Sequence, residues 1–276
     1  MELIGGQAVV EGVMMISPKK VAISVRNEKG KIVSKVEERE SLFRTLRKVF
    51  FVRGIFALVE MLRLGVKALS WSSNQQLKKE EQISSGGMAI TMLISFALGI
   101  GLFVALPLWV AGLITEHSFW FNLLEGILRM LIFLAYVLII AQMNDVKRLF
   151  EYHGAEHMAV HCYEAKKPLE VEHVRRFSTI HPRCGTAFIF LVFLVSLIIF
   201  SFIWSEHWWL RFGLRLALIP LVAGIAYELL RLGSKYHDRL WFRWLLLPGL
   251  WFQKITTQEP DRKQIEVALT SLKKVL

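Results

Sequence analysis

Residues 88–115 read MAITMLISFALGIGLFVALPLWVAGLIT, an apolar stretch that contains no charged side chain. It is longer than the roughly 18 apolar residues that a helix needs to cross a bilayer. Comparable stretches occupy residues 123–143, 187–204 and 212–232. In lipid, only a helix satisfies its own backbone within a single segment. The sequence therefore predicts a mainly α membrane protein with about four transmembrane helices.

The composition of the whole chain agrees with this class. Hydrophobic residues make up 54% of the 276 residues, and the mean hydropathy is +0.44. The first residues, MELIGG, have neither the basic start nor the apolar core of a signal peptide. We therefore expect the chain to insert through the predicted spans themselves.

Lysine and arginine are concentrated in three segments. Residues 1–87 hold 15 of the 34, residues 144–186 hold 7, and residues 231–276 hold 9. A four-span topology places all three segments on one side of the membrane, and cytoplasmic loops carry the excess of basic residues. We therefore expect a multi-pass protein with both termini and residues 144–186 in the cytoplasm.

The formal net charge of +11 indicates an acidic partner. The basic residues lie beside the predicted spans and no nucleic-acid-binding motif accompanies them, so we expect no nucleic acid. Membrane lipids, including anionic headgroups, are the expected partners, at about 1 kcal/mol per basic residue near the surface. Cys162 and Cys184 fall on the predicted cytoplasmic side, where thiols stay reduced, so no structural disulfide is expected.

Outside the spans, the pattern predicts smaller elements. Residues 21–26 and 31–36 alternate like strands around a turn at 27–30, which predicts a small N-terminal β-hairpin. Basic and apolar residues share the helical segment 41–71, which suits either the headgroup plane or packing on other protein. The tryptophan-rich residues 241–252 indicate an interfacial or re-entrant element. Residues 260–276 have the spacing of an amphipathic helix.

These elements divide the chain into six parts. The predicted order is an N-terminal glycine-rich motif with the β-hairpin, an amphipathic helical segment, transmembrane helices 1 and 2, a cytoplasmic segment rich in histidine and cysteine, transmembrane helices 3 and 4, and an interfacial segment with the C-terminal helix. In the same order, the boundaries are 1–40, 41–87, 88–143, 144–186, 187–232 and 233–276.

The sequence HGAEH at residues 153–157 carries the chemistry. On a helix, positions i, i+3 and i+4 share one face, so His153 and His157 could bind one metal ion. Glu156 beside them would accept a proton from metal-bound water, as in zinc-dependent hydrolysis. The alternative is a solvated amphipathic helix whose histidines face water.

A catalytic zinc needs a third protein ligand, with water in the fourth position. His181 and Cys184 form a possible half-site in the turn HPRCG, which could equally be a turn without a metal. Glu228 lies within the fourth predicted span, where a carboxylate is costly unless it is paired or functional. It could ligate the metal or pair with a basic residue such as Arg231. His161 continues the histidine face of the helix, as a further ligand or a surface residue.

Several motifs carry a family resemblance. They are GGQAVVEGVMM at 5–15, YHGAEH at 152–157, HPRCGT at 181–186, LPGLW at 247–251 and TTQEPD at 256–261. On these residues the chain resembles, nearly end to end, the bacterial YqhQ-like family of uncharacterised membrane proteins. The resemblance implies the bacterial cytoplasmic membrane and a predicted metal-dependent enzyme of unknown reaction. It also directs attention to Gln7 and Glu11, in a glycine-rich segment that either folds against the site or forms a turn.

The order H-x-x-E-H also resembles the inverzincin metalloproteases. That resemblance would make His153, His157 and Glu228 the zinc ligands and Glu156 the base. Nothing else in the chain resembles those soluble proteases, and Gly154 weakens the helix by about 1 kcal/mol.

Two functional hypotheses follow. The first is a cytoplasm-facing zinc hydrolase that acts on a membrane-associated substrate. The second is a non-enzymatic membrane scaffold or transporter that contains a structural metal. Three protein ligands with water favour the enzyme, and four protein ligands favour the scaffold.

Overall fold

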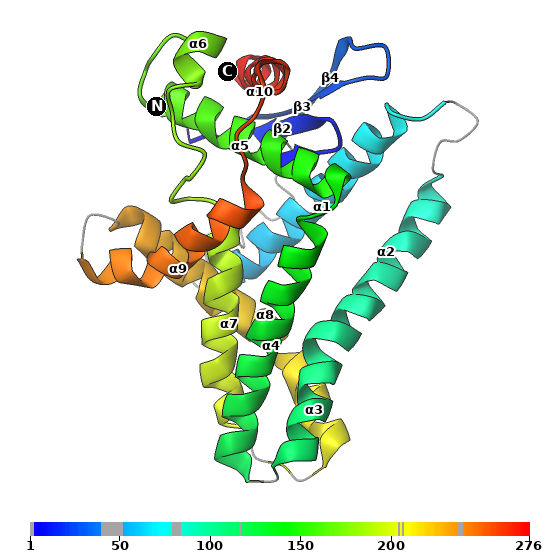
Figure 1. Cartoon of the computed structure of the whole chain (residues 1–276), viewed down its shortest axis with the longest axis vertical. Coiled ribbons are helices and arrows are strands. Elements are labelled where there is room, and N and C mark those ends of the chain that lie inside the picture. The colour runs from blue at the N-terminus through cyan, green and yellow to red at the C-terminus, as the bar shows by residue number, and fades with distance from the viewer. Residues whose placement is uncertain are drawn as a thin grey trace.

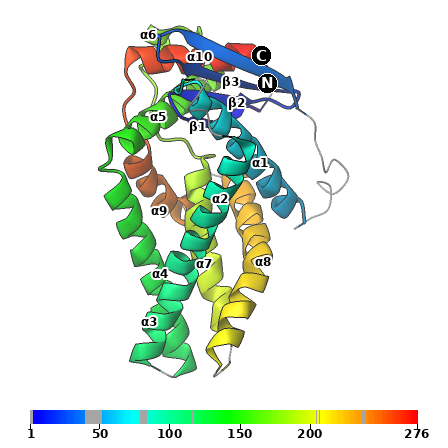
Figure 2. The same cartoon turned by 90° about the vertical axis from the view of Figure 1, so that its right-hand side faces the viewer.

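A computed structural model describes residues 3–39, 52–78, 84–115, 117–203, 205, 207–236 and 240–276. Figure 1 and Figure 2 show a bundle of long helices with a layer of strands and helices at one end. Both described ends of the chain lie in that layer, and the turns between the long helices lie at the other end. The chain therefore has two parts, and the histidine-rich helix lies where they meet.

The strands form one antiparallel sheet in the order β1-β2-β3-β4. β3 (Lys20–Arg26) and β4 (Ile32–Glu38) confirm the predicted hairpin. The sheet is larger than predicted, because the glycine-rich segment adds β1 (Gly5–Val9) and β2 (Gly12–Ile16). Glu11, with φ of 53°, makes the turn between these two strands.

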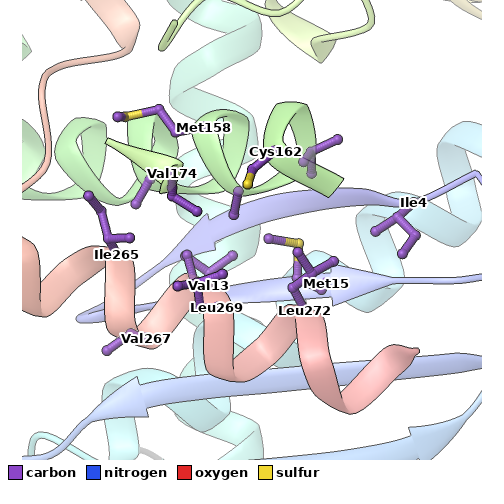
Figure 3. Close-up of a cluster of buried hydrophobic side chains, with 14 of the residues drawn as sticks. Ile4, Val13, Met15, Met158, Cys162, Val174, Ile265, Val267, Leu269 and Leu272 are labelled. Carbon is purple, nitrogen blue, oxygen red and sulfur yellow. The ribbon is translucent and has the colours of Figure 1, made fainter. Parts of the chain in front are cut away.

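Helices cover both faces of the sheet. α5 (Asn144–Glu164) and α10 (Arg262–Val275) lie on one face, where Val13 and Met15 join their buried side chains (Figure 3). α1 (Val52–Asn74) covers the other face, against Met14. Neighbouring residues of β2 point to opposite faces, as the pleat requires. The strand is buried on both faces, which explains its continuous apolar sequence.

The two amphipathic segments are both helical where they are described. The C-terminal helix is confirmed; it begins at Arg262 because Asp261 and Gln264 form a capping box. Of the segment 41–71, residues 41–51 lie outside the described residues. The described part, α1, packs against protein, with Glu60 and Ala68 among its buried residues.

Within the part of the chain that the structure describes, three helices are long and apolar enough to cross a membrane: Gly86–Ile114, Phe119–Ile140 and Trp208–Gly233. The first contains α2 (Ser85–Ile100), the π-helical turn η3 (Gly101–Ala105) and α3 (Leu106–Ile114). The others lie within α4 (Ser118–Ile140) and α8 (Trp208–Lys235).

The predicted span at 187–204 is a shorter helix, α7 (Gly185–Ser201), so three of the four predicted spans reach full length. The apolar sequence continues to residue 204, but the helix ends at the cap residue Phe202. α7 nevertheless runs through the bundle beside α4 and α8 (Figure 1).

The tryptophan-rich segment forms one helix, α9 (Leu240–Thr256), with Pro248 inside it. In Figure 1 it lies across the direction of the long helices. A Cβ at Gly249 would lie 2.7 Å from Cα of Ala187, so glycine allows α9 to touch the start of α7. This contact brings the end of α9 beside α5.

The bundle also contains a buried charged cluster that the sequence analysis did not identify. Glu125 on α4 contacts Arg129 and lies 3.4 Å from Nη2 of Arg215 on α8. Arg129 donates to Ser196 of α7 over 2.9 Å, and Arg215 donates to Asn122 over 2.9 Å. All five side chains are buried. These polar contacts join α4, α7 and α8.

Candidate metal centre

The face of α5 that carries His153 and His157 lies against the segment that follows α9, residues 257–261. Gln258 donates its backbone N–H to the carbonyl of Phe150 over 3.0 Å. A Cβ at Gly154 would overlap the carbonyl oxygen of Gln258. Glycine is therefore required at this position, because the two backbones lie in contact.

The hydrogen bonds of His153 and His157 define their tautomers. His153 Nδ1 lies 2.8 Å from the carbonyl oxygen of Thr256, and His157 Nδ1 contacts the carbonyl oxygen of Thr179. A carbonyl only accepts, so each Nδ1 carries the proton and donates. The lone pair of each neutral ring is then on Nε2. Metal-binding histidines are oriented in this way in proteins.

Cys184 adds a thiol to the two imidazoles. It caps the start of α7, and its Sγ lies 3.3 Å from Nε2 of His153. Thr186 donates its hydroxyl to Sγ over 3.3 Å and its backbone N–H over 3.5 Å. One ligand atom from each of His153, His157 and Cys184 lies within 4.8 Å of the others. We call these three residues the metal group.

His181 is near this group but has other partners. Its Nδ1 accepts the backbone N–H of Arg183 over 3.2 Å, so Nε2 carries the proton and donates to Glu164 over 3.3 Å. With His161 and Glu164 it forms a second cluster of possible ligands. Burial, followed by the neighbouring His161, His157 and Arg183, lowers the pKa of His181 to about 3. In this arrangement neither ring nitrogen of His181 offers a lone pair to a metal.

Glu156 is buried beside the metal group. Its Oε2 lies 3.5 Å from Nε2 of His157. A Cβ at Gly6 would lie 2.6 Å from Cγ of Glu156, so β1 packs directly over this side chain. Burial raises the pKa of the Glu156 carboxyl to about 7, although His153 opposes the shift. A carboxyl with this pKa exchanges its proton near neutral pH.

The structure places Glu228 away from the metal group. The carboxylate of Glu228 forms an ion pair with Arg53 of α1, with 2.7 Å between Nε and Oε1. A Cβ at Gly54 would lie 2.8 Å from Tyr227, so α1 approaches α8 closely enough for this pair. The paired alternative for Glu228 is therefore the one observed, with Arg53 as the partner.

The glycine-rich segment does fold against the site, through Gly6 and Gln7, which line the same cavity as Glu156. Glu11 instead pairs with Arg148 on α5, with 2.7 Å between Nη2 and Oε2. It also accepts the hydroxyl of Tyr152 over 3.3 Å. Glu11 thus fixes the sheet to α5 and adds no carboxylate to the metal group.

A cavity of about 840 Å³ lies between the sheet layer and the bundle. The metal group and Glu156 form part of its wall. Apolar side chains from α4, α7 and α9 form another part, and they include Val137, Ile189 and Phe252. The cavity therefore has a polar side with the possible metal ligands and an apolar side within the bundle.

A family model described as a protein of unknown function, DUF1385, matches residues 49–276. The chain belongs to the DUF1385 family. It is also 34% identical over 292 residues to the uncharacterized protein YqhQ of Bacillus subtilis (strain 168), covering 99% of this chain and 92% of that protein. This confirms the resemblance to a YqhQ-like family. No solved structure matches the chain. The DUF1385 description assigns no reaction, so any function has to be argued from the site.

Some residues that position the site escaped the sequence analysis. The carbonyls of Thr179 and Thr256 orient the two histidines, and backbone groups carry no signal in the side-chain pattern. The side-chain amide of Gln253 accepts the backbone N–H of His181 over 2.9 Å and donates to its carbonyl oxygen over 3.0 Å. Gly6 and Thr256 were within the quoted motifs, so the resemblance marked their segments without giving their roles.

Proposed function

We propose that the protein is a membrane-embedded hydrolase that depends on a divalent metal. Zinc is the metal that its ligand set suits best. The observation that carries the proposal is the convergence of His153, His157 and Cys184 with both Nδ1 atoms already committed to backbone carbonyls. Imidazole and thiolate are ligands that zinc prefers, and three of them leave the fourth position to water.

The chemistry would divide between the metal and Glu156. Bound zinc lowers the pKa of its water toward about 7 and polarises the substrate. The Glu156 carboxylate lies 3.5 Å from His157 Nε2, so it would be the base that accepts a proton from water activated at the metal group. The base predicted from the motif is therefore well placed for hydrolysis.

The cellular setting belongs to the same proposal. Of the three basic segments, the strands, α5 and α10 lie at the sheet end of the molecule, and α9 lies beside the bundle below that layer (Figure 1). We place this end in the cytoplasm of a bacterial cell and the bundle in the cytoplasmic membrane. Anionic headgroups would then contact the basic residues near the bundle.

A scaffold or transporter with a structural metal is the alternative. A closed zinc site uses four protein ligands. Among the described residues, no fourth histidine, cysteine or carboxylate joins the metal group. The neighbouring His181 is committed to Glu164 and Arg183. This geometry favours the open, catalytic arrangement.

A second candidate activity is acyl transfer by Cys184 without a metal. Its Sγ lies 3.3 Å from His153 Nε2 at the start of α7, so a possible nucleophile and a possible base are in contact. His153 would then be the base and Thr256 would orient it. This mechanism gives no role to His157, whose Nε2 carries a lone pair toward the same site, so we rank it second.

The test combines metal removal with one substitution. Membrane lipids are incubated with the purified protein, and the products are identified by mass spectrometry. Chelation should abolish turnover, and zinc should restore it. Glu156→Gln should retain the metal and lose about 100-fold or more in rate. Glu151→Gln, on the same helix but bonded to Gln264, is the matched control and should retain activity.

The two mechanisms differ in the metal-free state. Turnover that survives complete chelation and stops on alkylation of Cys184 would establish the cysteine mechanism. If Glu156→Gln and Glu151→Gln are equally active, the role of Glu156 as base is wrong.

A further inference from the structure

The apolar side of the cavity has no role in water activation. Five residues define it, and we call them the apolar floor: Phe133, Val137, Ile140, Ile189 and Phe252. The rings of Phe133 and Phe252 lie 5.5 Å apart, so α4 and α9 meet within the floor. The cavity volume of about 840 Å³ is in the range of small-molecule sites, roughly 300–1,000 Å³.

The apolar floor extends into the helices of the bundle. Phe133 and Ile140 belong to the helix Phe119–Ile140, which is long and apolar enough to cross a membrane. At 1.5 Å per residue, Phe133 lies about 10 Å below the end of that helix. On α7, Ile189 lies about 8 Å beyond Cys184 by the same measure. The cavity therefore has the metal group at one end and extends along helices that are apolar enough to lie in the hydrocarbon core of a membrane.

The metal group favours chemistry at a carbonyl. A single zinc with a carboxylate base polarises a carbonyl and activates one water, whereas many phosphate-cleaving sites hold two metals about 3.5–4 Å apart. The neighbouring cluster does not supply a second site in this arrangement, because Nδ1 of His181 accepts from Arg183 and Nε2 carries the proton.

We infer that the substrate is an acyl lipid whose tail lies on the apolar floor and whose ester or amide carbonyl reaches the metal group. This inference rests on the proposed function. The water oxygen bonds to the acyl carbon, and the bond from that carbon to the ester oxygen or the amide nitrogen breaks. Glu156 passes the water's proton to that leaving atom. The products are a fatty acid and a deacylated lipid.

Two neighbouring isoleucines on α4 provide a matched pair of variants. Ile140 lines the cavity. Ile139 is 65% exposed and points out of the bundle. Ile140→Trp fills the floor with a large side chain, and Ile139→Trp makes the same change on the outer surface. Ile189→Trp is a second filling variant on a different helix.

The binding test uses a photoreactive fatty acid with the protein in phosphatidylcholine nanodiscs. In the wild type, the label should map to residues of the apolar floor. Ile140→Trp and Ile189→Trp should lose this label, and Ile139→Trp should keep it. Label found only on exposed positions such as Leu131, with no change in the filling variants, would overturn the inference, because bulk lipid gives that pattern.

The activity test compares p-nitrophenyl palmitate with p-nitrophenyl acetate. The filling variants should lose about tenfold or more of the palmitate rate, with the acetate rate and zinc content unchanged. Zinc-bound protein that cleaves neither ester, or cleaves both equally in every variant, would overturn the acyl-lipid inference and leave the metal site intact. Purified protein without bound metal would instead overturn the proposed function. The photolabelling would still show whether a fatty acid binds at the apolar floor.

Discussion

At the residue scale, Gly154 explains why the motif reads HGAEH. A glycine inside a helix costs about 1 kcal/mol relative to alanine. Here the position touches the carbonyl oxygen of Gln258, two residues after the Thr256 that orients His153. The glycine thus weakens the helix and permits the contact that directs His153.

We expect Gly154→Ala to lower zinc affinity by about 10- to 100-fold, because displacing the 256–258 segment removes the hydrogen bond that orients His153. Zinc affinity is measured by competition with a chromogenic chelator. Gly213→Ala, at a helical glycine with open space around it, is the control and should leave the affinity unchanged. Equal affinities in the two variants would show that the 256–258 segment does not position the ligand.

Of the five ligands predicted from the sequence, the structure brings His153, His157 and Cys184 together, and the spacing and chemistry of these three are local signals. The sequence could not assign Glu228, whose ion pair joins residues 175 positions apart. Nor could the sequence show whether His181 or Cys184, three residues later, lies closer to His153. The choice depends on the geometry of the turn and on Gln253, which is distant in sequence and holds the backbone of His181.

At the element scale, buried charged side chains link the long helices α4, α7 and α8. Glu228 was considered as a carboxylate within a predicted span, but Glu125 on α4 was not. Glu125 lies between Arg129 and Arg215, and all three are buried. Removing one partner from such a cluster leaves the others without a counter-charge.

We expect Glu125→Gln to reduce the free energy of unfolding by about 3–5 kcal/mol, since two buried guanidinium groups lose their carboxylate. Thermal unfolding in detergent, followed by circular dichroism, measures the change. Glu170→Gln, at a side chain that is 70% exposed, serves as the control and should unfold like the wild type. A Glu125→Gln protein as stable as this control would contradict a structural role for the cluster.

Hydropathy predicted where the long helices lie, but it did not predict the end of α7 or the continuous helix of α9. The apolar sequence at 187–204 is continuous, and only the backbone at Phe202 ends α7 early. The tryptophan-rich segment was predicted only as an interfacial or re-entrant element, and the structure shows one helix, α9, that continues through Pro248. The contact of Gly249 with Ala187 joins α9 to the start of α7, and a contact between such distant parts of the chain leaves no local signal in the hydropathy.

At the scale of the whole molecule, the sheet layer and the far turns lie at opposite ends of the bundle (Figure 2). The proposed orientation puts the sheet layer in the cytoplasm. In intact cells, a membrane-impermeant maleimide should label His117→Cys, at the far turn, and leave Lys29→Cys unlabelled until the cells are opened. The wild type, with Cys162 and Cys184 both buried, gives the background. The reverse labelling pattern would invert the orientation.

The central claim is that His153, His157 and Cys184 bind one metal ion. Elemental analysis of the protein purified in detergent tests it most directly. We predict about one zinc per chain in the wild type and near none in His157→Ala. His173→Ala, on the short helix α6 (Val171–Val174) outside the metal group, should retain the wild-type content. Equal metal content in all three proteins, including none in any of them, would contradict the account.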